Sequence, residues 1–527
     1  MRSSVFCPFV WAWGGGSLFP VRSPHLVILA DAAPTIDARL TEMIGTFNDD
    51  VLWAWILIPL LVGVSLYITF RTGFVQFRLF PEMFRVLGNK PEIAPDGKKA
   101  VSSLQAFFIS AAARLGTGNI IGVSVAISLG GPGAVFWMWV MALVVCAASF
   151  VESTLAQLYK VRHPAGYRGG PAYYIERGLG SRWLAVVFAV ILIMTFPLVF
   201  NAVQSNTITN TVANSVGELG AGTGTIFSVV IGALLVVLTG LVIFGGVRRI
   251  AHTAQALVPF FAALYVVIGL IIMVMHWQLV PGMITSIVAN AFGLGEFAAA
   301  ALGVVIIQGV RRGMFSNEAG LGSAPNAAAS ASVTHPVKQG LVQTLGVYLD
   351  TMVVCSVTAF IILLGYQGNL DGSFEGDMTQ MALMSMLGPW ALHLMTLIIF
   401  LVAFTSVLGN YYYGESNVEY LSGNGNVLFG YKVVFLVATF LGSLGSIDLV
   451  WTLADTTMGL MALVNLIAIA PLTVIACRLL KDYGEQRRQG LDPVFTRDRM
   501  PDIRGVECWE PREEPATEGR EPAGRDS

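Results

Sequence analysis

The sequence is poor in charged residues. Only 12% of its 527 residues are Asp, Glu, Lys or Arg, whereas soluble globular chains carry about 25%. Hydrophobic residues make up 55% of the chain, in runs long enough to cross a bilayer. The composition therefore excludes an ordinary soluble protein and predicts an all-α polytopic membrane protein. The formal net charge of −2 gives no reason to expect a nucleic-acid partner.

Residues that carry metal, redox or hydrolytic chemistry are also sparse. The five cysteines stand singly, without a CxxC pair, so disulfide or metal chemistry is not expected. The six histidines are scattered in the same way. Because the sequence offers no nucleophile–base pair and no ligand cluster, we do not expect an enzyme.

Eleven stretches are long and apolar enough to span a membrane. The loops after the first, third and fifth stretches carry Lys and Arg, whereas loops on the opposite side, such as "GELGAGTG" and "HWQLVPG", have none. The positive-inside rule then predicts a multi-pass protein of the cell (inner) membrane, with its N-terminus outside and its C-terminus in the cytoplasm. The predicted spans are 51–71, 103–130, 134–158, 183–213, 225–244, 253–276, 296–330, 337–364, 389–412, 430–446 and 449–478.

The two ends of the chain differ from this apolar body. Residues 1–50 are expected to form an N-terminal segment, either a signal peptide or a translocated tail, because an apolar stretch follows Arg2 and precedes a small-residue "ADA". Residues 51–100 hold an extra first helix and a cytoplasmic loop. Residues 481–527 are charged and contain proline, which predicts a disordered cytoplasmic tail.

The ten spans after the first divide into two sets of five, 101–280 and 281–480. Each set crosses the bilayer an odd number of times, which predicts a five-plus-five inverted repeat. Each set opens with an interrupted helix, "RLGTGN" (114–119) and "RGMFSN" (312–317). Paired breaks are typical of a transporter site at the bilayer midplane, because freed backbone groups must line a cavity or bind something. Close helix packing by the glycines is the alternative.

The breaks belong to longer motifs, "ARLGTGNIIGVSVAISLGGPGAVFWMW" (113–139) and "RGMFSNEAGLGSAPNAAA" (312–329). These motifs resemble the alanine or glycine:cation symporter family, and the resemblance covers roughly residues 50–480. It implies a LeuT-like fold and a secondary active symporter that imports alanine or glycine with sodium by alternating access. A proton-coupled small amino-acid transporter and a transporter-like amino-acid sensor remain alternatives. A monomer is expected, because a LeuT-like site lies within one chain.

Polar groups at the breaks are candidates for binding the amino acid. The positive end of a half-helix suits a carboxylate, although polar side chains there can also act only as helix caps. The resemblance suggests that Gln204 faces the substrate, with interhelical hydrogen bonding as the alternative. Phe297 is a candidate for closing over a small methyl group, or for core packing. The candidate substrate-binding residues are Thr117, Gly118, Asn119, Gln204, Phe297, Ser316 and Asn317.

The LeuT-like arrangement also implies a sodium site between the first broken helix and the span 389–412. Adjacent hydroxyls can join freed carbonyls there, because sodium prefers oxygen ligands. The alternative is that the hydroxyls bond back to a carbonyl one turn earlier. The implied ligands are the carbonyls of Ala112, Leu115 and Val402 and the hydroxyls of Thr405 and Ser406.

Glu318 is an ionisable residue inside a span, which makes it a functional candidate by default. Its expected partner is Arg114, Arg311 or Arg312. A structural ion pair and a proton-titrating carboxylate both remain open. Asn410 departs from the family pattern, in which tryptophan is common at this place, and it leaves the size limit of the substrate open.

Overall fold

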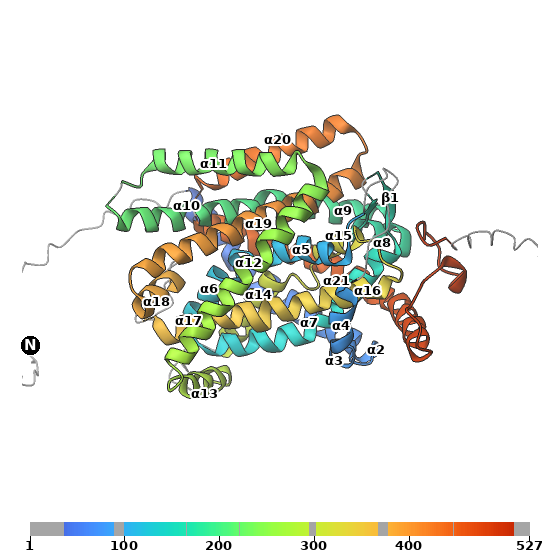
Figure 1. The fold of residues 1–527 in the computed structure, drawn as a ribbon, viewed down its shortest axis with the longest axis horizontal. Helices are drawn as coiled ribbons and strands as arrows, with labels where there is room; N and C mark the ends of the chain where they lie inside the picture. Colours follow the sequence, from blue (N-terminus) through green and yellow to red (C-terminus); the bar gives the residue numbers. More distant parts are fainter. Residues whose placement is uncertain are drawn as a thin grey trace, which may run out of the picture.

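Apolar helices make up nearly all of the computed structural model (Figure 1). The structure describes residues 36–88, 100–164, 166–220, 222–294, 302–366, 378–445 and 447–510. Within these residues, nine helices are long and apolar enough to cross a membrane, or ten if the bent pair at the first break counts as one span. The all-helical multi-pass architecture is therefore confirmed. The count of eleven spans and the inverted repeat stay predictions, because the span predicted at 296–330 is divided into two shorter helices.

One long helix leads into the bundle. It includes a stretch of π-helix and ends at Arg71, where short helices turn away from it. Residues 1–35, which contain most of the predicted N-terminal segment, lie outside the described residues. The elements are α1 (Ile36–Phe47), η1 (Asn48–Leu57), α2 (Ile58–Arg71), α3 (Val75–Arg78), α4 (Phe80–Arg85) and η2 (Val86–Gly88).

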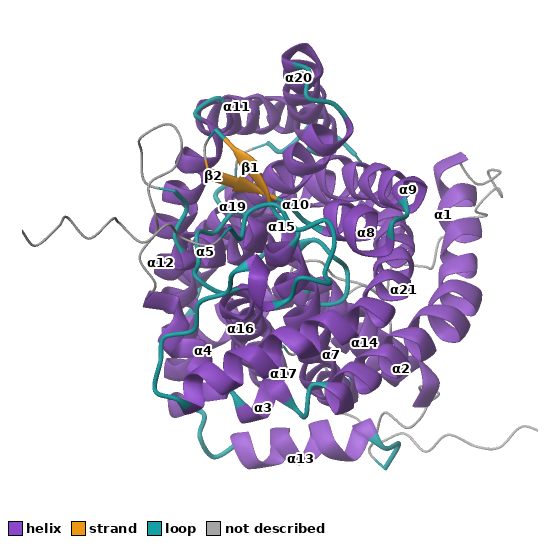
Figure 2. Cartoon of the chain, turned by 90° about the vertical axis from the view of Figure 1, so that its right-hand side faces the viewer, coloured by secondary structure: helices purple, strands orange, loops and turns teal. Residues whose placement is uncertain are grey.

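The next part of the chain contains the first broken helix, formed by α5 and α6 with a bend of 60° between them. A short antiparallel hairpin follows α7, with Val161 opposite Arg168 (Figure 2). The short helices α8 and α13 were not predicted. The elements are α5 (Ser103–Arg114), η3 (Thr117–Asn119), α6 (Ile121–Gly130), α7 (Gly133–Leu158), β1 (Val161–His163), β2 (Gly166–Arg168), α8 (Pro171–Leu179), α9 (Arg182–Ile193), η4 (Met194–Phe200), α10 (Asn201–Glu218), α11 (Thr225–Ile243), α12 (Gly246–Met275) and α13 (Val280–Ala291).

The last part opens with the second broken helix and closes with the longest helix, α21. The short helix α18 was also not predicted from the sequence. The elements are α14 (Leu302–Asn317), α15 (Ala324–Ala329), α16 (Pro336–Val347), η5 (Tyr348–Cys355), α17 (Ser356–Gly365), α18 (Met378–Leu387), α19 (Trp390–Leu421), α20 (Gly425–Gly442), α21 (Ile447–Arg488) and η6 (Arg497–Arg499).

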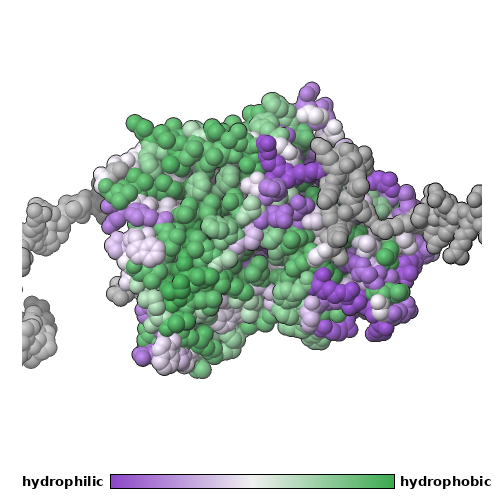
Figure 3. Space-filling model, viewed as in Figure 1, coloured by the Kyte–Doolittle hydropathy of each residue, from purple (hydrophilic) through white to green (hydrophobic). Residues whose placement is uncertain are grey.

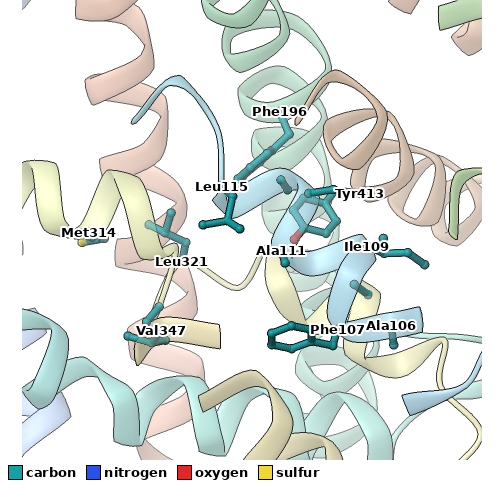
Figure 4. Close-up of a cluster of buried hydrophobic side chains, with 14 of the residues drawn as sticks. Ala106, Phe107, Ile109, Ala111, Leu115, Phe196, Met314, Leu321, Val347 and Tyr413 are labelled. Atoms are coloured by element: carbon teal, nitrogen blue, oxygen red, sulfur yellow. The ribbon is translucent and has the colours of Figure 1, made fainter. Parts of the chain in front are cut away.

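Helix α5 runs through the middle of the bundle and packs against α12, α15, α16 and α19. Figure 4 shows Leu115 at its end and Leu321 of the second break within one buried apolar cluster. At the outside, α11 and α20 lie side by side and expose mostly apolar side chains, which contribute to the hydrophobic surface in Figure 3. The two breaks are thus held inside protein, while the apolar outer faces suit lipid.

The prediction of a disordered tail over 481–527 is wrong for residues 481–510. Helix α21 continues to Arg488, and the segment after it packs against the ends of other helices. The Trp509 indole is 6% exposed and donates to the carbonyls of Gln157 and Leu158, both at 3.2 Å. The charges that suggested disorder are satisfied by ion pairs, such as the 2.8 Å contact of Asp492 with the buried Lys338. Residues 511–527 lie outside the described residues.

We expect Trp509→Ala to lower the midpoint of thermal unfolding in detergent. Removing a buried tryptophan side chain costs about 3–5 kcal/mol, and Trp509 also supplies hydrogen bonds to the last turn of α7. Trp183→Ala is the matched control, because Trp183 is 70% exposed. Equal midpoints for the two variants would show that the segment after α21 contributes no stability.

Candidate substrate and ion site

The first break is a short turn closed by an asparagine. Helix α5 ends at Arg114, Gly116 is extended, and η3 leads into α6. The Asn119 side-chain oxygen accepts from the Gly116 amide at 3.1 Å. The Gln204 oxygen, from α10, accepts from the Thr117 amide at 3.2 Å. Asn119 is therefore a cap, as one interpretation of the sequence held, while the Thr117 hydroxyl is buried without a hydrogen-bond partner among the described residues.

The second break is a longer loop between Asn317 and Ala324. Its backbone turns through left-handed conformations at Glu318 (φ 55°), Gly320 and Gly322, and such a conformation is uncommon for any residue other than glycine. The Asn317 side-chain oxygen accepts from the Ala319 amide at 3.0 Å. The polar side chain at the end of α14 thus caps its own break, as Asn119 does at the first.

The freed amides of the second break are bound by Glu152, a buried carboxylate of α7 that sequence reasoning missed. Its two oxygens accept from the amides of Gly320 at 3.3 Å and Gly322 at 3.2 Å. The Asn465 side chain adds a hydrogen bond to Glu152 at 2.9 Å. The positive backbone end at this break is therefore already matched by a carboxylate of the protein.

A second missed carboxylate, Asp350 of η5, joins the two breaks. The Asn119 side-chain amide donates to one of its oxygens, and the Ser316 hydroxyl donates to the other at 2.6 Å. The Thr351 hydroxyl also donates to Asp350 at 2.9 Å and accepts from the Asn317 amide at 3.1 Å. Asp350 is 1% exposed, and within the described ranges it has no ion pair. The signal in the sequence was a lone acid within the span 337–364.

An aromatic stack lies directly against the first break. A Cβ atom placed on Gly118 would lie 2.7 Å from the Phe315 ring, so Gly118 allows this close approach. Phe315 stacks with Phe200 at 4.6 Å and with Trp451 at 5.0 Å between ring centroids. Phe315 belongs to the hexamer 312–317 but was not singled out, while the residue expected to close the site, Phe297, lies outside the described residues.

Two of the implied sodium ligands, Ala112 and Ser406, are in contact where α19 crosses α5. The Ser406 hydroxyl donates to the Ala112 carbonyl at 2.8 Å, across the two helices. The Thr405 hydroxyl bonds back to the Val402 carbonyl at 2.9 Å, which is the alternative pattern that the sequence left open. Leu115 and Val402 line the same small cavity, which also contains Asn119 and Tyr265.

The expected ion pair of Glu318 with an arginine is wrong. Glu318 accepts from the Ser323 hydroxyl at 2.7 Å, because the left-handed backbone directs its side chain toward its own loop. Arg311 and Arg312 lie 3.5 Å and 2.5 Å from Asp455 of α21 instead.

The third candidate arginine, Arg114, donates to the Gln343 carbonyl at 2.9 Å and to the Ser149 hydroxyl at 3.4 Å. It forms no ion pair in the described part of the chain and reaches Glu152, Glu318 and Asp350 only through longer-range electrostatics. Among the amide side chains in the first two turns of α10 (Asn201, Gln204 and Asn206), two bond away from the site. Asn201 bonds to Thr439 at 2.9 Å and Asn206 to the Gly445 carbonyl at 2.7 Å, so only Gln204 faces the break.

Comparison with known proteins gives a consistent result. A family model described as the sodium:alanine symporter family matches residues 37–497. The chain is 49% identical to the amino-acid carrier protein AlsT of Bacillus subtilis, over 89% of this chain and 97% of AlsT. It is 46% identical to the probable sodium/glutamine symporter GlnT of the same organism, over 89% and 96%. It is 35% identical to the sodium/alanine symporter AgcS of Methanococcus maripaludis, over 85% and 98%.

Among solved structures, the crystal structure of MhsT in complex with L-phenylalanine matches with a TM-score of 0.51. The match covers 72% of this chain and 99% of MhsT at 14% sequence identity. At this identity the likeness concerns the fold alone, and it confirms the predicted LeuT-like fold class.

We expect Asn119→Ala to lower the midpoint of thermal unfolding. The substitution removes one acceptor from the Gly116 amide and one donor from Asp350, and an unpaired buried polar group costs about 1–3 kcal/mol. Asn214→Ala, at an exposed position of α10, is the matched control and should change little. A midpoint for Asn119→Ala equal to that of the control would contradict a structural role for this hydrogen-bond cluster.

Proposed function

The chain belongs to the sodium:alanine symporter family, and we propose that it is a secondary active symporter that imports alanine and glycine together with sodium. Amino-acid transport across a membrane is the activity of the family, so the protein is a transporter and not an enzyme. The choice of amino acid and of the driving ion is the proposal. The observation that carries it is the meeting of both helix breaks around Asn119, Ser316 and Asp350.

The carboxylate of the amino acid is placed at the first break. The first amides of α6 have no acceptor within their own helix, and the helix dipole favours an anion there. The Thr117 hydroxyl is buried without a protein partner in the described chain, so it is available as a further donor. The second break is less suitable for an anion, because Glu152 already binds the amides of Gly320 and Gly322.

The amine of the amino acid is placed on the side of the second break. Ser316 and Asn317 stand there, and the negative charge of Asp350 lies between the two helices. Gln204 completes the first break from α10. The side chain of the substrate then has little space, because Phe315 lies against Gly118 and the neighbouring cavity is small and lined mainly by apolar side chains. These features support a glycine hydrogen or an alanine methyl.

Sodium is placed between α5 and α19. The carbonyls of Ala112, Leu115 and Val402 and the hydroxyls of Thr405 and Ser406 are neutral oxygen donors, which suits a hard monovalent cation. The 2.8 Å bond from the Ser406 hydroxyl to the Ala112 carbonyl brings α19 against the end of α5 and supports this placement. This site borders the end of α5, which is one side of the first break, and the proposed carboxylate site lies on the other side, at the start of α6. Ion binding would therefore fix the break that carries the carboxylate site.

We expect alanine and glycine to compete for uptake into proteoliposomes, and leucine and arginine not to compete. Glutamine belongs in the same panel, because the relative GlnT is named a probable sodium/glutamine symporter. Phe315→Leu replaces the ring that faces Gly118 with a smaller side chain. Larger apolar amino acids should then compete with alanine for uptake. Phe150→Leu, at another fully buried phenylalanine, should leave the selectivity unchanged. Strong competition by leucine or glutamine in the parent would contradict the size argument.

We expect the double variant Thr405→Ala, Ser406→Ala to need much more sodium for half-maximal alanine uptake. Ion and substrate stabilise each other by the same factor, typically about 1–3 kcal/mol or roughly 5- to 150-fold. At saturating sodium, the alanine affinity of the variant should approach that of the parent, because the groups at the breaks are intact.

Parallel titrations of Asp350→Asn distinguish the two places that could hold the ion. If the sodium concentration for half-maximal uptake is unchanged in the double variant but rises strongly in Asp350→Asn, the ion binds at Asp350 instead. Accumulation of alanine driven by a proton gradient without sodium would replace sodium coupling by proton coupling. Binding of alanine without any accumulation in the proteoliposomes would indicate that the protein is an amino-acid sensor and not a transporter.

A further inference from the structure

A groove of about 700 Å³ lies far from the helix breaks, between the end of the extra first helix and the end of α21. Its walls are the last turn of α2, the short helices α3 and α4, and the last turns of α21. This volume is within the range of small-molecule sites in proteins. None of the residues proposed to bind the amino acid or sodium lines this groove, so a ligand bound here is independent of the transport proposal.

The groove is strongly basic. Five basic side chains line it, against the two acidic side chains of Glu82 and Glu485. Glu82 forms an ion pair with Arg487 at 3.2 Å, and Glu485 lies 3.9 Å from Lys481. The basic residues are Arg71, Arg78, Lys481, Arg487 and Arg488.

Three of these arginines keep their charge unpaired. Arg71 and Arg488 have no acidic partner among the described residues, and Arg78 donates only to the Thr72 carbonyl at 3.3 Å. All three are exposed. Three unpaired guanidinium groups around one groove make a site for an anion, and guanidinium groups match the geometry of phosphate oxygens.

The groove lies at the ends of two candidate membrane spans. The candidate spans Glu42–Arg71 and Val450–Arg488 both finish at it, at the end of the molecule where hydrophilic residues gather (Figures 1 and 3). This is the face that carries the Lys- and Arg-rich loops and is predicted to be cytoplasmic. At the groove, the rings of Phe70 and Phe74 are 66% and 46% exposed and form apolar surface that acyl chains can contact.

We propose that this groove binds the phosphate group of an anionic phospholipid. Basic pockets between helices on the cytoplasmic side of a membrane are suited to such headgroups, and the exposed phenylalanines provide contacts for the acyl chains. The two walls belong to different parts of the chain and already touch through the Tyr483 hydroxyl, which donates to Glu82 at 2.6 Å. A lipid in the groove therefore ties the extra first helix to α21.

Lipid titration of the purified full-length protein tests this site. In neutral detergent, phosphatidylglycerol should raise the midpoint of thermal unfolding, and phosphatidylcholine should not. In the double variant Arg71→Gln, Arg488→Gln the half-saturating phosphatidylglycerol concentration should rise about 30-fold, which corresponds to about 2 kcal/mol for two basic side chains. Both arginines are exposed and lack an ion pair among the described residues, so the variant should fold.

The charge-matched control is the double variant Arg182→Gln, Arg497→Gln, whose arginines are exposed and do not line the groove. It should respond to phosphatidylglycerol as the parent does. An equal response of the groove variant and the parent would overturn the site, and so would equal stabilisation by phosphatidylcholine. Inorganic phosphate is the third arm, and full stabilisation by phosphate at the same concentration would assign the groove to a free anion instead of a lipid.

Discussion

A helix that breaks at membrane depth must satisfy its own freed backbone groups, and this constraint organises the centre of the molecule. The bilayer core offers no water for that purpose, and each unsatisfied group costs several kcal/mol. At the first break, Asn119 and Gln204 accept from the amides of Gly116 and Thr117. At the second, Asn317 and Glu152 accept from amides of the loop that follows α14. The polar side chains at the centre are therefore fixed in place by backbone needs before any ligand is considered.

The breaks themselves could be predicted from the sequence, but most of their partners could not. Glycine, asparagine and serine within an apolar run do not favour a continuous helix, so the break within residues 114–119 was visible as an interruption. The second break was predicted too early, because residues 312–317 form the helical end of α14 and the chain leaves the helix only after Asn317. Glu152 and Asp350 lie in other helices, and only the fold brings them to the breaks. The partner of Glu318 was predicted from charge complementarity alone and was wrong, because the local backbone brings the Ser323 hydroxyl to its carboxylate.

Hydropathy predicted the long helices well but did not predict the short ones. A run of about twenty apolar residues has few alternatives to a spanning helix, whereas α8, α13 and α18 are too short to give such a signal. Charge composition also misled at the end of the chain. Residues 489–510 are polar enough to suggest disorder. However, Asp492 forms an ion pair with the buried Lys338, and the Trp509 indole donates a hydrogen bond to the end of α7. The partners that order this segment lie on helices distant in the sequence, such as Lys338 on α16, and composition does not reveal them.

Different kinds of bond hold the centre of the bundle and its surroundings. Away from the breaks, Arg168 is paired with Glu415 at 3.0 Å and the buried Lys338 with Asp492 at 2.8 Å. Separating such a pair in a low dielectric is costly, since it leaves an uncompensated buried charge. Asp350, by contrast, is held by three neutral donors.

A hydrogen bond to a charged group contributes about 1.5–3 kcal/mol net, and an ammonium group or a sodium ion can replace such a neutral donor at a carboxylate. The bond from the Ser406 hydroxyl to the Ala112 carbonyl, where α19 meets α5, joins two neutral groups and contributes about 0.5–1.5 kcal/mol. These contacts lie at the two places where we propose that the amino acid and sodium bind, while the ion pairs lie in other parts of the bundle.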